Sequence, residues 1–140
     1  MQGIMGEREL TDIDYAVLAN FRFRLRQFLA FSESKAVEYG LTPQQHQALL
    51  AIRAAEPDKA TIGYVAERLI LKPHSASGLV DRLEALGMII RQTSAEDRRQ
   101  AHLALTDSAR TLLARLSQTH REEIRRLRPM LAELLASIDE

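Results

Sequence analysis

Apolar residues along this chain recur mostly with helical spacing, and two short stretches have the spacing of strands. The clearest helical stripe lies between Pro73 and Gly87 and consists of Ala76, Leu79, Val80, Leu83 and Leu86. Proline suits the first position of a helix, where its missing N–H costs nothing, and glycine suits the left-handed residue after the last turn. The pattern therefore predicts a helix that begins at Pro73 and ends before Gly87.

The same spacing predicts three helices earlier in the chain, over about residues 12–34, 43–55 and 63–70. Thr42 and Gln45 form a capping box at the start of the second helix, with Pro43 at its first position. Thr61-Ile62 is β-branched and is expected to form a strand stub before the short third helix. The few residues left before Pro73 predict a tight turn.

The spacing of apolar residues changes after Gly87. Residues 88–91 are rich in β-branched side chains, and Leu103 and Leu105 alternate with other residues across 101–105. The polar residues between these two strands predict the tip of a hairpin. A long helical region follows, capped by Thr106-Asp107, and Pro129 is expected to end one helix and start another.

These elements predict a mainly helical fold with one small β-hairpin. A short helix, a tight turn and a second helix make a helix-turn-helix, and the hairpin beside it makes a wing. The first and last helices carry more apolar surface than one small lobe can bury, which favours pairing with a second copy. We expect a dimerisation helix over residues 1–36, a winged helix-turn-helix lobe over 37–106 and dimerisation helices over 107–140.

The polar face of the helix that begins at Pro73 carries small or hydrogen-bonding side chains, rather than the common mixture of glutamate and lysine. Small side chains let a helix approach a large partner, and hydroxyl, imidazole and guanidinium groups bind base edges and phosphates. The alternative is a surface helix that happens to carry little charge. The candidate DNA-binding residues here are Lys72, Pro73, His74, Ser75, Ser77, Gly78 and Arg82.

The predicted hairpin tip carries two adjacent arginines, Arg98 and Arg99. Guanidinium groups at the tip of a β-ribbon suit the narrow, strongly negative minor groove of DNA. Asp97 alone would repel phosphate, but two residues from Arg99 it is expected to hold that guanidinium through a charge-assisted hydrogen bond. The alternative is a solvated turn, and the helix upstream favours the DNA-binding interpretation.

Composition narrows the function classes. The 140 residues carry no formal net charge, which does not indicate a general polyanion binder, yet arginine, a bidentate ligand of phosphate and guanine, far outnumbers lysine. The absence of cysteine excludes disulfides and thiolate metal sites, and the four histidines are too scattered to predict a metal or cofactor. No catalytic motif, leader or membrane-length apolar run is visible, which favours a cytoplasmic binding protein rather than an enzyme.

Several short motifs together resemble the MarR family of transcriptional regulators, over about residues 39–113. They are Gly40-Leu41-Thr42 with Gln45, Val-Ala-Glu-Arg-Leu at 65–69, Leu-Val-Asp-Arg-Leu-Glu-Ala-Leu-Gly at 79–87, Asp97-Arg98-Arg99, and Leu105-Thr106. The resemblance implies an intertwined homodimer that binds a pseudo-palindromic operator in double-stranded DNA. It also implies that the helix at Pro73 enters the major groove and that Arg99, braced by Asp97, enters the minor groove.

Many members of that family release DNA when they bind a small aromatic or anionic effector, so the resemblance implies an effector-responsive repressor. Without cysteine, the peroxide-sensing branch of the family is excluded. An effector cleft is expected where the first helix, the helix after Thr42 and the helix after Thr106 meet. The candidate effector-binding residues are Arg24, Phe28 and His46. Plain packing or surface exposure is the alternative for each of them.

Two rival functions come from other classes of protein. The first is a winged-helix dimer that binds a partner protein instead of DNA, and Arg82, Arg98 and Arg99 are unfavourable for it. The second is a small-molecule enzyme, for which the sequence offers no candidate residue.

Overall fold

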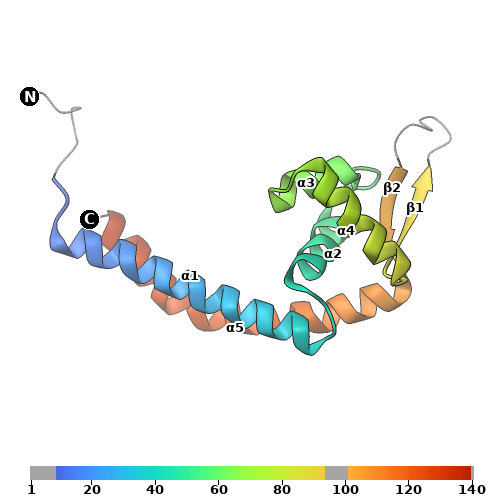
Figure 1. Cartoon of the computed structure of the whole chain (residues 1–140). Coiled ribbons are helices and arrows are strands. Elements are labelled where there is room, and N and C mark those ends of the chain that lie inside the picture. The colour runs from blue at the N-terminus through green and yellow to red at the C-terminus, as the bar shows by residue number, and fades with distance from the viewer. Residues whose placement is uncertain (1–8, 94–100, 140) are drawn as a thin grey trace, which may run out of the picture. The chain divides into compact units, whose positions relative to one another are not determined.

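The computed structural model describes residues 9–93 and 101–139, which form five helices and one antiparallel hairpin (Figure 1). In chain order the elements are α1 (Asp12–Glu38), α2 (Pro43–Ala54), α3 (Ile62–Leu69), α4 (Pro73–Ala85), β1 (Ile89–Thr93), β2 (Ala101–Leu105) and α5 (Asp107–Asp139). The predicted fold class, mainly helical with a small hairpin, is confirmed. No helix in these two ranges is long and apolar enough to cross a membrane.

The chain divides into two compact units, and two of its helices contribute residues to both. The winged-helix unit is the segment Ser32–Thr119. The helical unit consists of the described residues of Met1–Phe31 and His120–Glu140. The boundaries therefore fall inside α1 and α5 rather than at the ends of those helices.

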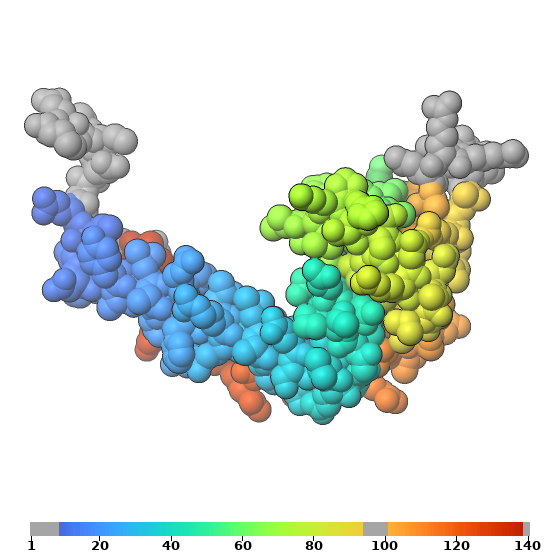
Figure 2. All heavy atoms as spheres, viewed as in Figure 1, coloured from blue at the N-terminus to red at the C-terminus, as the bar shows by residue number. Residues whose placement is uncertain are grey.

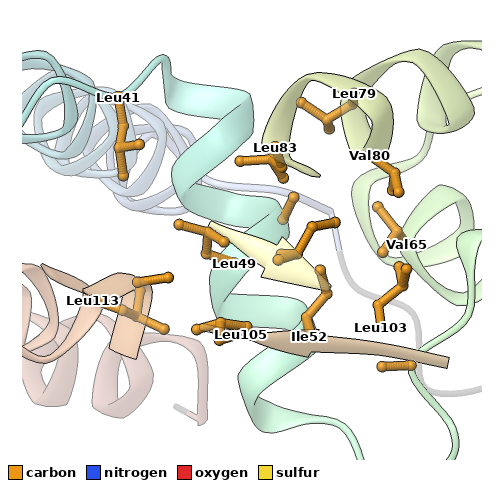
Figure 3. Close-up of a cluster of buried hydrophobic side chains, with 14 of the residues drawn as sticks. Leu41, Leu49, Ile52, Val65, Leu79, Val80, Leu83, Leu103, Leu105 and Leu113 are labelled. Atoms are coloured by element: carbon orange, nitrogen blue, oxygen red, sulfur yellow. The ribbon is translucent and has the colours of Figure 1, made fainter. Parts of the chain in front are cut away.

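The core of the winged-helix unit contains apolar side chains from every helix and strand of that unit (Figure 3). The largest fully buried ones include Leu49 on α2, Val65 on α3, Leu83 on α4, Ile89 on β1 and Leu116 on α5. The buried side chains of α3, α4 and the hairpin belong to the same core. This shared core fixes the positions of the helix-turn-helix and the wing relative to each other.

The start of α2 is fixed by the predicted capping box, which is confirmed. Thr42 Oγ1 accepts a hydrogen bond from the Gln45 N–H at 3.1 Å, and Gln45 Oε1 accepts one from the Thr42 N–H at 3.0 Å. Upstream, α1 continues past its predicted end near Ser34 to Glu38. It stops where Gly40 adopts a left-handed conformation, with φ at 83°.

The strand stub predicted at Thr61-Ile62 is wrong. Thr61 is the N-cap of α3, where its Oγ1 accepts a hydrogen bond from the Tyr64 N–H at 3.1 Å, and Ile62 is the first helical residue. The cap satisfies an N–H that has no partner inside the helix, and this outweighs the preference of β-branched residues for strands. The chain contacts the hairpin one residue earlier, where the Leu103 N–H donates to the Ala60 carbonyl at 2.7 Å.

A tight turn joins α3 to α4, as predicted. Ile70 follows the last residue of α3 and adopts a left-handed conformation, with φ at 55° and ψ at 52°. The Leu71 N–H then donates to the Ala66 carbonyl at 2.8 Å and closes the turn. Lys72 is extended, and Pro73 is the first residue of α4.

The hairpin has the predicted burial pattern, with Ile89 opposite Leu105 and with Leu103 also buried. Thr106 stabilises the open end of the hairpin, because the Thr106 hydroxyl donates to the Gly87 carbonyl at 2.7 Å. Gly87 has φ at 73°, the left-handed conformation expected just past α4. The hydroxyl thus ties the end of β2 to the residue that leads into β1.

The prediction that Pro129 separates two C-terminal helices is wrong, because α5 continues through it. Proline removes one backbone hydrogen bond from a helix interior. Apolar residues on either side of it, Leu127, Met130 and Leu131, line one pocket with residues of α1. This shared packing in the helical unit accounts for the continuous helix.

Candidate nucleic-acid interface

Helix α4 buries one face in the winged-helix unit and leaves the other face exposed. Ala76, Leu79, Val80 and Leu83 are buried, as their spacing predicted. Leu86, which the same spacing placed on this stripe, is the C-cap of the helix and is 56% exposed. Figure 2 shows the yellow-green atoms of α4 at the surface of this unit.

All seven candidates in and before α4 lie outside the core. The exposed ones are Lys72, Pro73, His74, Ser75 and Arg82, and the half-buried ones are Ser77 and Gly78. A Cβ atom added at Gly78 would meet nothing within 4 Å beyond its own helix backbone and chain neighbours, among the described residues. The space in front of this position is therefore open to a partner. Contact between these seven residues and DNA stays a prediction.

The N-terminus of α4 lacks the side-chain cap that Thr42 and Thr61 give to α2 and α3. Lys72 holds the N-cap position, and an ammonium group cannot accept a hydrogen bond. The first N–H groups of a helix have no carbonyl partner within it. Uncapped N–H groups beside a lysine side chain attract an anion such as a phosphate.

An ion-pair cluster that the sequence analysis did not find joins α4 to β1. Arg91 on β1 forms salt bridges with Asp81 and with Glu84 on α4, and the distance from Arg91 Nε to Glu84 Oε1 is 3.5 Å. The cluster compensates the Asp81 carboxylate, which lies on the polar face of α4 and would otherwise repel phosphate. Opposite charges on two successive elements were the available signal, but no fixed spacing links them.

Three predicted residues, Asp97, Arg98 and Arg99, lie outside the residues that the structure describes. The strands that lead to them are described, and their final pair is Thr93 opposite Ala101. The contact of the two arginines with the minor groove, and the hydrogen bond by which Asp97 would hold Arg99, stay predictions.

Comparison with known proteins finds similarity to one family over part of the chain. The MarR family profile matches residues 39–100, which include α2, the helix-turn-helix and β1. The transcriptional repressor MdtR of Bacillus subtilis is 30% identical over 98 residues, which cover 70% of this chain and 59% of MdtR. Residues 39–100 of this chain are thus similar to the MarR family.

Solved structures have the same fold as this chain. AbsC of Streptomyces coelicolor, a MarR family transcriptional regulator, is 21% identical, with a TM-score of 0.72 over 95% of this chain and 91% of AbsC. MepR of Staphylococcus aureus, solved in a complex with DNA, is 20% identical, with a TM-score of 0.63 over 93% of this chain and 99% of MepR. The likeness confirms the winged helix-turn-helix architecture.

The three candidate effector-binding residues lie in different units. Arg24 and Phe28 line one pocket of the helical unit, whereas His46 is buried on α2 in the winged-helix unit. The pocket has a volume of about 190 Å³, and its other lining residues are Phe21, Leu25, Ile124, Leu127, Met130 and Leu131. Phe28 also meets the ring of His120 edge-on, with 6.1 Å between centroids.

Arg24 is the charged residue of this apolar pocket. Its Nη1 donates to Gln27 Oε1 at 3.1 Å, but its Nε is buried and has no hydrogen-bond partner among the described residues. A buried donor without a partner costs about 1–3 kcal/mol, so an acceptor brought by a ligand would relieve that cost. The chemistry of the pocket therefore suits a small apolar or aromatic molecule with one anionic group.

Proposed function

We propose that this chain is a homodimeric, cytoplasmic repressor of the MarR family that binds a DNA operator and releases it when a small aromatic anion binds. The observation that carries the proposal is the exposed face of α4, whose uncapped N-terminus follows Lys72 and whose side chains are small or hydrogen-bonding. A helix of this kind fits the major groove by its N-terminal end.

Charge and chemistry of the α4 surface support DNA as the partner. His74, Ser75 and Arg82 are exposed and offer donors to base edges and phosphates. The acidic residues of α4, Asp81 and Glu84, are both paired with Arg91. The structure of MepR was determined with DNA bound, which supports the same partner for this chain.

Dimer formation is supported by the apolar surface of the helical unit. Apolar patches of this extent are uncommon on a monomer and mark an interaction surface. A second copy is the occupant that the proposal requires, because two half-sites need two symmetric readers. The exposed large apolar residues of this unit are Leu10, Ile13, Tyr15, Leu18, Phe21, Phe23, Leu25, Leu29, Ile124, Leu135 and Ile138.

Effector response is supported by the pocket around Arg24 and by the helices that line it. Both α1 and α5 continue from the helical unit into the winged-helix unit. A ligand that shifts these two helices would therefore move residues of both units. A coupling of about 1–3 kcal/mol between effector and operator would change occupancy by up to about a hundredfold.

A gel shift with the DNA upstream of the chain's own gene tests the central proposal. The wild-type protein should bind it as a dimer, and Arg82→Ala should weaken binding roughly five- to a hundredfold, as expected for one lost base or phosphate contact. Arg53→Ala, an exposed arginine on α2 in the same unit, is the matched control and should bind like the parent. If neither specific nor non-specific binding occurs at low salt, the DNA function is wrong and the protein-partner alternative is favoured.

The effector proposal has its own test with benzoate as the probe. Benzoate should lower the operator affinity of the wild-type protein, and Arg24→Ala should remove that response while leaving DNA binding intact. Arg26→Ala, an exposed arginine on the same helix, should respond like the wild type. An unchanged benzoate response in Arg24→Ala would contradict the placement of the effector in this pocket.

A further inference from the structure

Ile70, in the turn between α3 and α4, has a backbone conformation that disfavours its side chain. Its φ of 55° and ψ of 52° place it in the left-handed region, which crowds the Cβ atom of a β-branched residue. Glycine or asparagine is the ordinary choice at the position after a helix. Of the described non-glycine residues, Asp58 and Ile70 have a positive φ, and aspartate tolerates it far better than isoleucine.

The flanking residues fix this conformation. Leu69 and Leu71 both pack against the core, and the Leu71 N–H donates to the Ala66 carbonyl at 2.8 Å. The turn therefore needs the left-handed backbone at residue 70, but the fold makes no use of the side chain there. The Ile70 side chain is 92% exposed, the highest exposure among the large apolar residues that the structure describes as exposed.

Ile70 is close in sequence to the N-terminus of α4, whose exposed face is the candidate DNA-binding surface. It lies two residues before Lys72, the N-cap of α4, and the atoms of α3 and α4 form adjoining surface in Figure 2. Strained residues cluster at ligand-binding sites and active sites, where the surrounding structure holds them in place. The major groove offers one apolar group to such a side chain, the 5-methyl group of thymine.

We propose that Ile70 is a specificity-determining residue that packs against a thymine methyl group next to the bases contacted by α4. The inference rests on the proposed DNA-binding function and adds a preference for thymine at one position of each half-site. It also predicts that the side chain lowers the stability of the free protein.

The test compares Ile70→Asn and Ile70→Leu on a duplex obtained by binding-site selection with the wild-type protein. Asparagine tolerates the left-handed conformation and lacks the apolar group, so Ile70→Asn should raise the Tm by about 2–4 °C. The same variant should bind the duplex about four- to tenfold more weakly for each half-site, since one buried methyl group alone corresponds to about fourfold. Ile70→Leu keeps an apolar side chain and should retain most of the affinity.

A duplex with uracil in place of thymine removes only the methyl group. The wild-type protein should lose about fourfold in affinity at one position of each half-site, and Ile70→Asn should be insensitive to that change. Leu86→Asn is the control, because Leu86 is an exposed apolar residue at the other end of α4 with ordinary backbone dihedrals. It should bind like the wild type.

Three outcomes would overturn the inference in different ways. If Ile70→Asn binds the selected duplex like the wild type, Ile70 does not contact DNA, while the proposed function stands. If Ile70→Asn binds weakly but uracil has no effect on the wild type, the contact with a thymine methyl group is wrong. If the wild-type protein binds no duplex, the proposed function itself fails and the inference fails with it.

Discussion

Single residues decide what the exposed face of α4 presents to a partner. The sequence was sufficient to place His74, Ser75 and Arg82 on that face, because helical spacing alone separates them from the buried stripe. It was not sufficient for Arg91, whose partner Asp81 is ten residues away. That contact depends on the turn at Gly87, which brings β1 back along α4, and no local pattern encodes it.

At this scale, Arg91→Ala should weaken operator binding more than it lowers stability. The pair with Asp81 is partly exposed, so the free energy of unfolding should fall by at most about 1 kcal/mol. The uncompensated Asp81 carboxylate would then face phosphate, which should reduce affinity about fivefold. Urea denaturation and gel shift measure the two effects, and Asp81→Asn in the same protein should restore binding. Failure of that restoration would show that the carboxylate is not the cause.

Ser77→Phe should block entry of α4 into the groove. Ser77 is half-buried and lies one helical turn from the exposed residues His74 and Asp81, so a large ring there would hold the helix away from base edges. Specific binding should be lost while the oligomeric state, measured by light scattering, is unchanged. Ser34→Phe, at an exposed site on α1, is the matched control. Parent-like binding by Ser77→Phe would mean that α4 does not enter a groove by this face.

Elements were predicted well where a local chemical signal marks their ends and poorly where packing decides. The capping box at Thr42 and the glycine after α4 fix helix ends through backbone hydrogen bonds, and both were identified from sequence. Thr61 carries the same type of signal, but Thr61 and Ile62 are both β-branched, and this favours a strand in the sequence pattern. At Pro129 the sequence shows the missing N–H but not the packing of α5 against α1, which keeps the helix continuous.

Removal of the α2 cap should have a measurable cost. Thr42→Ala leaves the Gln45 N–H without its acceptor and should lower the free energy of unfolding by about 1 kcal/mol. Thr111→Ala is the control, because the Thr111 hydroxyl donates to a carbonyl inside an exposed helix turn rather than capping a helix. Equal urea midpoints for the two variants would contradict the energetic role of the cap.

The wing should contribute through Arg99, which lies outside the described residues. Arg99→Ala should weaken operator binding and reduce the slope of log affinity against log salt by about one unit per subunit, as expected for one lost phosphate contact in each half-site. Arg115→Ala, an exposed arginine on α5, should keep the parent slope. If Arg99→Ala changes neither the affinity nor the slope, Arg99 does not contact the operator.

At the scale of the whole molecule, the sequence indicated terminal helices with too much apolar surface for one lobe. It did not indicate that the compact units divide inside α1 and α5, because a continuous helical pattern carries no boundary signal. The exposed side chains of the helical unit, such as Leu135 and Ile138, are consistent with a second copy as their partner.

Leu135→Asp should therefore yield a monomer. The carboxylate would be placed on the apolar surface proposed to pair, where its burial without a counterion is costly. Light scattering should give twice the chain mass for the wild type and a single chain mass for the variant, with operator affinity lost in parallel. Ile90→Asp, at an exposed apolar residue of the winged-helix unit, should remain dimeric. A dimeric Leu135→Asp would place the pairing surface elsewhere.

The division of both long helices between the two units has a consequence for synthesis on the ribosome. The winged-helix unit is one contiguous segment, so its core can assemble once residues up to Leu116 have emerged. The helical unit draws on residues before 32 and after 119, so its amino-terminal half must wait for the last part of this sequence to be translated. During that interval the apolar side chains near the N-terminus are open to chaperones, and the proposed dimer can form only after translation has passed α5.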